Sequence, residues 1–332
     1  MAPPPTTVAL PDEPRVQAGW SLRAGDYLVS NEQGVVVVRD GAVVSNPQPV
    51  TSPVESAFAD ESGDIIFLTP DPDRYPSEWP HRDHGGGNTL WRLHPDGTLE
   101  LVLRADGSEG PNGALSIWQV ENFGFEDFPS YRSTPILTTD EVGSDLVWLA
   151  PTHPPTQWPR PYPPHQPETW DIAGAGWLDG PPGGLLFVAI HSGGDHWLER
   201  WTLYIGVSPW NTNPIPRETP CSDDPTVTDC LGTVTAMGGP LIAYTETDSR
   251  HTITDLVIYN TDFGDEVRRF RVAESPVFVK SIHASATRVV VSLIEMVDGE
   301  YRYLPATVID NTVVNLTVVS TVVVPGVATI VP

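Results

Sequence analysis

One pattern recurs along this chain and limits its fold more than any other feature: apolar runs of strand length alternate with tight turns. The clearest copy has the runs 56–59 (SAFA), 64–68 (DIIFL), 89–93 (TLWRL) and 98–103 (TLELVL), with DESG between the first two and HPDG between the last two. Runs of this length, separated by Gly, Asp and Ser, are typical of strands joined by turns. Four runs in succession predict a four-stranded antiparallel meander.

The same order returns in copies that begin near residues 17, 232 and 279, a looser copy begins near residue 171, and residues 113–165 are expected to form one further blade. Repeats that each contain four strands predict an all-β fold, a β-propeller of four-stranded antiparallel blades, because radial repetition leaves only short strand edges. We expect six blades, with five or seven as alternatives. The apolar run at residues 317–324 is expected to lie beside the first blade and complete it.

Composition supports an all-β fold. The 36 Pro and 28 Gly residues require many turns and exclude a helix-rich chain. A β-sandwich, or two in tandem, would use the same strands and turns and is the alternative. Residues 1–15 are rich in Pro and predict a tether, and residues 16–332 predict a single propeller domain.

A resemblance rests on residues 90–97 (LWRLHPDG), which have an expected strand on either side. This module resembles the blade repeats of six-bladed propellers of the TolB and NHL type, and the likeness extends over most of the chain after residue 16. It implies the fold and no activity, because one fold hosts many functions.

Charge excludes some partners. The chain has 43 acidic and 18 basic side chains and a formal net charge of −25. It would be repelled by phosphate, so neither nucleic acid nor an anionic membrane is an expected partner. No apolar run reaches the length of a membrane-spanning helix, so membrane insertion is not expected either. Solubility is the preferred explanation of the acidity, with cation binding as the alternative.

The two cysteines, Cys221 and Cys230, flank a polar segment with turn-forming residues. Two cysteines that close one polar loop predict a disulfide and therefore an oxidising compartment. Two free thiols are the alternative. We expect a secreted or cell-surface protein whose signal sequence is absent from this chain.

A first long loop, at residues 71–88, holds three Asp, one Glu and two His. Oxygen ligands at alternating positions suit calcium, which Asp71, Asp73 and Asp83 would bind. The spacing matches no EF-hand, so an ordinary solvated loop is the preferred interpretation. A transition metal held by Asp83 and the two histidines is a further alternative. No other cofactor is expected.

A second long loop, at residues 152–170, carries Trp158, Tyr162 and Trp170 among many prolines. Rigid aromatic side chains lose little entropy on binding and stack on sugars or peptides. Together with Trp79 of the first loop, these rings are the predicted ligand-binding residues. The alternative is that they pack over the blade edge.

Two histidine-containing segments have structural explanations. Residues 191–196 (HSGGDH) invite a catalytic interpretation, but they predict a hairpin turn between two strands. His283 lies in an expected inner strand, where a hydrogen-bonded core histidine is the usual case.

The preferred function is an exported binding module that recognises a protein, peptide or glycan through the loops of one face, and a monomer is expected. The alternative is a propeller hydrolase or lyase with a calcium ion in or near its central channel. The sequence leaves open whether the chain is an enzyme.

Overall fold

The computed structural model describes residues 16–31, 34–49, 54, 56–60, 62–69, 89–104, 116–120, 134–140, 143–150, 153–157, 170–178, 185–192, 198–206, 212–222, 230–238, 241–247, 252–260, 265–312 and 316–331. From residue 103 to residue 234 it describes only the course of the backbone. All regular structure in these ranges is β-strand. None of them contains a helix of the length and apolarity that crossing a membrane requires.

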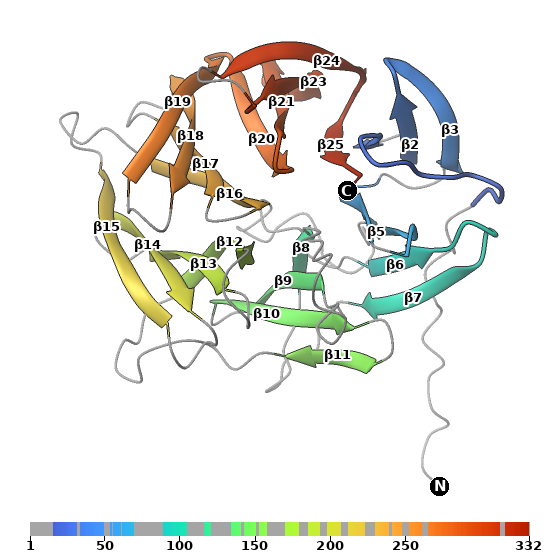
Figure 1. Cartoon of the computed structure of the whole chain (residues 1–332), viewed down its shortest axis with the longest axis horizontal. Coiled ribbons are helices and arrows are strands. Elements are labelled where there is room, and N and C mark those ends of the chain that lie inside the picture. Colours follow the sequence, from blue (N-terminus) through green and yellow to red (C-terminus); the bar gives the residue numbers. More distant parts are fainter. Residues whose placement is uncertain are drawn as a thin grey trace, which may run out of the picture.

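The strands form sheets that are arranged around a common centre (Figure 1). The first sheet has the order β25-β1-β2-β3, formed by Val327–Ile330, Tyr27–Asn31, Gly34–Arg39 and Ala42–Pro49. The second has the order β4-β5-β6-β7, formed by Ser56–Ala59, Ile65–Thr69, Thr89–Leu93 and Leu99–Arg104.

An eight-stranded sheet follows, with the order β15-β14-β13-β12-β10-β9-β8 and β11 paired to β10. Its strands β8 to β15 are Ser116–Val120, Thr134–Asp140, Gly143–Ala150, His153–Gln157, Trp170–Leu178, Leu185–Ser192, Leu198–Gly206 and Thr212–Ser222. A single parallel residue pair, Gly143 with Trp170, joins β10 to β12. The sheet therefore divides at this pair into two antiparallel halves of four strands each.

The last two sheets complete the chain. One has the order β16-β17-β18-β19, formed by Cys230–Gly238, Leu241–Thr247, Ile253–Asn260 and Asp265–Glu274. The other has the order β20-β21-β23-β24, formed by Val277–Ala284, Arg288–Val297, Pro305–Asp310 and Thr317–Pro325, and β22 (Glu300–Tyr303) pairs with β21. Repeated four-stranded antiparallel sheets around one centre are the architecture of a β-propeller, and the predicted all-β propeller fold is confirmed at this level.

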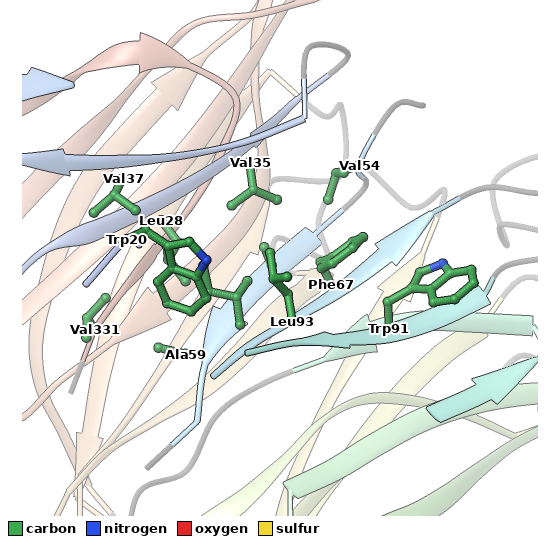
Figure 2. Packing of buried hydrophobic residues seen from close by; sticks show 12 residues of the cluster. Trp20, Leu28, Val35, Val37, Val54, Ala59, Phe67, Trp91, Leu93 and Val331 are labelled. Atoms are coloured by element: carbon green, nitrogen blue, oxygen red, sulfur yellow. The ribbon is translucent and has the colours of Figure 1, made fainter. Parts of the chain in front are cut away.

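Apolar side chains fill the spaces between successive sheets. Figure 2 shows the cluster between the first and second sheets, with Trp20 at one end and Trp91 at the other. Similar clusters lie between the last sheet and each of its two neighbours. A strand in such a position is buried on both faces, which explains why β5 is apolar along most of its length rather than alternating.

The first sheet obtains its inner strand from the far end of the chain. The sequence predicts that residues 17–22 begin this blade, but Gly19 has a φ of 83° and the segment forms no strand. Its place is taken by β25, which pairs antiparallel with β1. The predicted completing run, residues 317–324, is instead the outer strand β24 of the last sheet.

Gly326, between β24 and β25, permits this change of sheet. Its φ is 153°, and a Cβ there would meet the carbonyl oxygen of Ser30 and lie 2.8 Å from Cγ1 of Val29. Only glycine fits so close to another strand with this backbone conformation. The connection between β24 and β25 therefore requires a glycine at position 326.

Candidate functional site

Hydrogen bonds between neighbouring sheets show which strand ends share one side of the molecule. Asn31, the last residue of β1, donates through Nδ2 to the carbonyl oxygen of Pro325 at 2.8 Å. The carbonyl oxygen of Asn31 accepts the N–H of Val54, two residues before β4, at 3.0 Å. The end of β1, the end of β24 and the start of β4 therefore lie on one side, which we call the loop face.

Strand alternation extends the loop face to other sheets. Because β5 and β6 are each antiparallel to the strand before them, Thr69 and Thr89 lie at this face, so residues 70–88 leave and re-enter the second sheet there. In the last sheet, β23 begins opposite the end of β24, which places the turn between β21 and β22 on the same side.

The opposite side, which we call the turn face, carries short aspartate turns. Four of its carboxylates accept a backbone N–H from a residue two to four positions away, at distances between 2.6 and 3.0 Å. These are the carboxylates of Asp26, Asp60, Asp96 and Asp310. Hydrogen bonds from Thr98 and Thr312 lower the pKa of Asp96 and Asp310 below the usual range, whereas burial raises the pKa of Asp60. Each of these carboxylates thus stabilises the turn in which it lies.

His94 gives the turn face its one cluster that resembles a metal site. Its Nδ1 lies 3.0 Å from Asp64, and its Nε2 lies 3.8 Å from Glu100. The two ring nitrogens point in different directions, so one ion could not contact both carboxylates through this ring. No group of three metal-ligating side chains gathers anywhere in the described residues.

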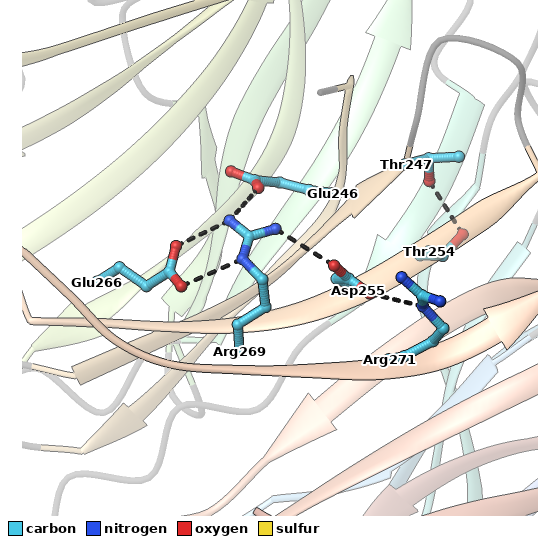
Figure 3. Close-up of polar contacts among 7 residues, drawn as sticks. All are labelled: Glu246, Thr247, Thr254, Asp255, Glu266, Arg269 and Arg271. Atoms are coloured by element: carbon cyan, nitrogen blue, oxygen red, sulfur yellow. Dashed lines mark hydrogen bonds and ion pairs between the residues drawn. The ribbon is translucent and has the colours of Figure 1, made fainter. Parts of the chain in front are cut away.

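An ion-pair network lies on the sheet of β16 to β19 (Figure 3). Glu246 is 5% exposed, and one of its oxygens lies 2.6 Å from Nη2 of Arg269. Arg269 also contacts Glu266 at 2.8 Å and Asp255 at 3.5 Å, and Asp255 contacts Arg271 at 3.4 Å. The hydrogen bonds that Arg269 donates to Glu266, and then the one to Glu246, raise its pKa. The guanidinium of Arg269 thus contacts three carboxylates, and one of these is the buried carboxylate of Glu246.

The loop-face end of the second sheet holds buried hydroxyl groups. Nε1 of Trp91 donates to Oγ1 of Thr69 at 3.0 Å, and that hydroxyl lies 3.4 Å from the carbonyl oxygen of Thr89. The hydroxyl of Thr89, a residue that is 1% exposed, has no hydrogen-bond partner, and neither has the buried hydroxyl of Ser56. Such groups are rare in folded proteins. The second sheet therefore has two buried hydroxyl groups without a hydrogen-bond partner at the end where residues 70–88 leave and re-enter it.

Polar side chains near the centre hold β25 in place. The N–H groups of Ala328 and Ile330 point away from β1. They donate to Oγ of Ser292 at 2.9 Å and to Nδ1 of His283 at 3.1 Å. Thr329 donates from Oγ1 to the carbonyl oxygen of Ala57 at 2.7 Å. Side chains of the last sheet thus accept hydrogen bonds from the N–H groups along one edge of β25, and the Thr329 side chain of β25 contacts the second sheet.

His283 is the most strongly perturbed of these groups. It is 6% exposed in β20, and burial lowers its pKa to about 4. The imidazole is therefore neutral at pH 7, with Nδ1 as acceptor and the proton on Nε2. The prediction of a hydrogen-bonded core histidine is confirmed.

Most of the predicted site residues lie outside the described residues. This holds for Asp71, Asp73, Trp79, Asp83, Trp158 and Tyr162. The predicted calcium site and aromatic patch therefore stay predictions. Trp170 is the first residue of β12, and only its backbone is described.

The sequence predicts one loop at residues 152–170, whereas the structure has a strand within this range. Residues 153–157 form β11, which pairs with β10. Its two prolines are tolerated because β11 has no partner strand on its other side among the described residues, and because its register with β10 shifts between Trp148 and Ala150, where neither proline is a paired residue. A local rule that assigns prolines to loops misses this edge strand.

The cysteines and the predicted hairpin lie on strands whose backbone alone is described. Cys221 is in β15 and Cys230 begins β16, and the disulfide stays a prediction. β13 and β14 pair antiparallel from Leu186 to Ser192, as the predicted hairpin requires, and His191 and Ser192 belong to β13. The predicted turn itself, at residues 193–196, lies outside the described residues.

Sequence reasoning missed one exposed patch at the loop face. It treats residues 301–310 as a single strand, whereas β22 and β23 separate at Leu304. β22 and β21 form a two-residue hairpin through Asp298 and Gly299, with φ of 54° and 84°. The Asp-Gly pair is a hairpin signal that could have revealed it.

No family model matches this chain, and no curated protein matches it. Solved structures do match, and three of them, each at low identity, are as follows. A puromycin hydrolase is 15% identical with a TM-score of 0.43, and the match covers 82% of this chain but only 40% of that one. The C-terminal WD40 domain of Sif2 is 11% identical with a TM-score of 0.39, over 95% and 89% of the two chains. An α-L-arabinanase of Penicillium chrysogenum, complexed with arabinobiose, is 12% identical with a TM-score of 0.42, over 88% and 94%. At these values nothing that those proteins bind or hydrolyse transfers to this chain.

Proposed function

We propose that this chain is a non-enzymatic propeller with six blades that binds a protein, peptide or glycan through its loop face. The observation that carries the proposal is the difference between the two faces. On the turn face, the turns at Asp60, Asp96 and Asp310 engage their own aspartates, whereas residues 70–88 leave and re-enter the second sheet at the loop face beside buried hydroxyl groups. Binding residues are concentrated on long loops held by a rigid scaffold.

The count of six blades is supported by the division of the eight-stranded sheet. With one residue pair between β10 and β12, its halves are each a four-stranded antiparallel unit, like the sheets of β4 to β7 and of β16 to β19. The TolB and NHL likeness remains part of this proposal. A structure that resolves every side chain would test it.

The inner strands support binding rather than catalysis. A propeller enzyme needs reactive groups that converge at the centre and remain available to a substrate. There His283, Ser292 and Thr329 hydrogen-bond to the backbone of neighbouring strands. These described groups have a structural role.

The binding residues in this proposal are Trp79, Trp158, Tyr162 and Trp170. Strand polarity supports placing them together, because β4 and β20 both begin at the loop face, and an inner strand β12 of the same polarity would begin there with Trp170. Aromatic side chains of this kind supply most of the energy in many interfaces. Export to the cell surface or medium, a Cys221–Cys230 disulfide and a monomeric state complete the proposal.

A paired substitution tests this function. Purified chain is screened against arrays of glycans and peptides, and hits are compared between wild type and a Trp158→Ala, Tyr162→Ala double variant. We expect the double variant to lose about 2 kcal/mol or more of binding energy, roughly thirtyfold in Kd. A Leu101→Ala, Val267→Ala double variant, which removes two exposed apolar side chains from outer strands, is the matched control.

Two results would contradict the proposal. One is unchanged binding of every hit by the aromatic double variant. The other is catalytic turnover of an array ligand by wild type, which would favour the hydrolase or lyase alternative. Calcium dependence of that turnover would place the ion in the catalytic site.

A further inference from the structure

The hairpin of β21 and β22 extends past the rest of the last sheet at the loop face. The first half of β21 pairs with β23, and its second half, from Ile294 to Val297, pairs with β22. The turn residues Asp298 and Gly299 have positive φ, as a tight two-residue hairpin requires. β20 pairs with the other edge of β21 from Val289 to Glu295, which supports the base of the hairpin.

Apolar and aromatic side chains gather on this hairpin and on β20. We call Phe278, Met296, Tyr301 and Tyr303 the hairpin patch. Tyr301 is 63% exposed and Met296 is 40% exposed. The rings of Phe278 and Tyr301 have centroids 6.4 Å apart and an interplanar angle of 83°. This perpendicular contact restrains the Tyr301 ring while leaving it open to a ligand, and the methionine beside it adapts to ligand shape.

The backbone of Tyr301 is also available to a ligand. Leu304 donates its N–H to the carbonyl oxygen of Leu293 at 2.9 Å, which fixes the phase of the antiparallel ladder. Pairs in such a ladder alternate, so Met296 and Tyr301 form a pair without mutual hydrogen bonds. The N–H and C=O of Tyr301 therefore point away from β21, to the side of β22 where no described strand pairs. An extended polypeptide is the ligand that bonds such an edge.

Charge indicates what kind of polypeptide fits. The tip of the hairpin carries Asp298 and Glu300, both exposed. Arg302 lies on the other face of β22, directly opposite Glu295. With Lys280 of β20, this region has three carboxylates and two cationic groups, within a chain of net charge −25. Such a surface attracts a cationic segment and repels an acidic one.

We propose that the hairpin patch binds an extended cationic peptide, which adds as a strand to β22 and places a lysine or arginine side chain over the Tyr301 ring. The proposal rests on the binding function proposed above and adds a contact site on the same face. A cation over an aromatic ring contributes at exposed sites, and main-chain bonds along β22 fix the direction of the peptide.

The test uses the full chain and three blocked nonapeptides. One alternates lysine with threonine, one replaces the lysines with glutamate, and one replaces the threonines with proline, which cannot donate ladder bonds. Affinity is measured by fluorescence anisotropy of the labelled peptides. We expect saturable binding of the lysine-threonine peptide, at least tenfold weaker binding of the proline peptide and no binding of the glutamate peptide.

Variants of Tyr301 separate the patch from general charge attraction. We expect Tyr301→Ala to weaken binding of the lysine-threonine peptide about fivefold and Tyr301→Phe to stay within twofold of wild type. Val267→Ala, at an exposed position on β19, is the matched control and should have no effect. Circular dichroism confirms that each variant is folded.

Several results would overturn the inference. One is the absence of saturable binding of the lysine-threonine peptide at millimolar concentration. Another is an equal loss of peptide affinity in the Tyr301→Ala and Tyr301→Phe variants. The third is a proline peptide that binds as tightly as the lysine-threonine peptide. Loss of array hits in the Trp158→Ala, Tyr162→Ala variant with retained peptide binding would support both proposals. Retained array hits with a peptide that depends on Tyr301 would refute the loop proposal alone.

Discussion

His283→Asn isolates the contribution of one buried histidine to acid sensitivity. The asparagine side chain keeps an acceptor near the position of Nδ1, which bonds Ile330, but it cannot take up a proton. In wild type the folded pKa is about 4, against 6.5 for the ordinary side chain. Below pH 6.5 the unfolded chain therefore binds a proton that the folded chain does not, so the free energy of unfolding falls as pH falls through this window.

The magnitude follows from the shift. A fall of the pKa from 6.5 to about 4, at 1.36 kcal/mol per unit, corresponds to about 3 kcal/mol in total, most of which is lost by pH 4.5. Urea unfolding of both proteins, followed by near-ultraviolet circular dichroism at pH 7.5 and pH 4.5, measures it. The stability of His283→Asn relative to wild type should rise by about 2 to 3 kcal/mol between the two pH values. A difference that is the same at both pH values would refute the assignment of a buried neutral histidine.

Three further predictions concern stability. Gly326→Ala should destabilise the fold by about 3 kcal/mol or more, since the alanine Cβ would press on the backbone of β1. The urea midpoint should therefore fall, and an unchanged midpoint would contradict the placement of β25. Arg269→Ala should cost about 3 kcal/mol because it removes the ion pair between Arg269 and buried Glu246. The more exposed Arg271→Ala should cost less than about 1 kcal/mol, and equal costs would be inconsistent with the network. Thiol titration of unreduced protein should find no free thiol, as the predicted bridge between Cys221 and Cys230 requires; that bridge would contribute about 2.7 kcal/mol, and two free thiols would disprove it.

Local pattern was enough to predict most strands of the first two sheets. Runs such as residues 56–59 and 64–68 are bounded by Gly and Asp turns, and they become β4 and β5 with nearly the same limits. The reason is that turn chemistry and strand length are both local properties. The repeated order of these units was then enough to predict the fold class.

Long-range pairing could not be predicted in the same way. Nothing in the four residues of β25 indicates that they pair with β1, about 300 residues earlier, and the run that looked suited to this place became β24. The edge of β25 that faces away from β1 donates hydrogen bonds to His283 and Ser292, whose positions depend on the completed last sheet. The hairpin patch was missed for a related reason, because exposure of Tyr301 depends on β22 extending past β23.

The most direct test of the proposed binding face is a crystal structure of the full chain that resolves Trp79, Trp158, Tyr162 and Trp170. The account predicts that all four rings lie on the loop face, on the same side as Asn31 and the β21–β22 hairpin, with at least part of each ring exposed. Rings divided between the two faces, or all buried against the sheets, would contradict it.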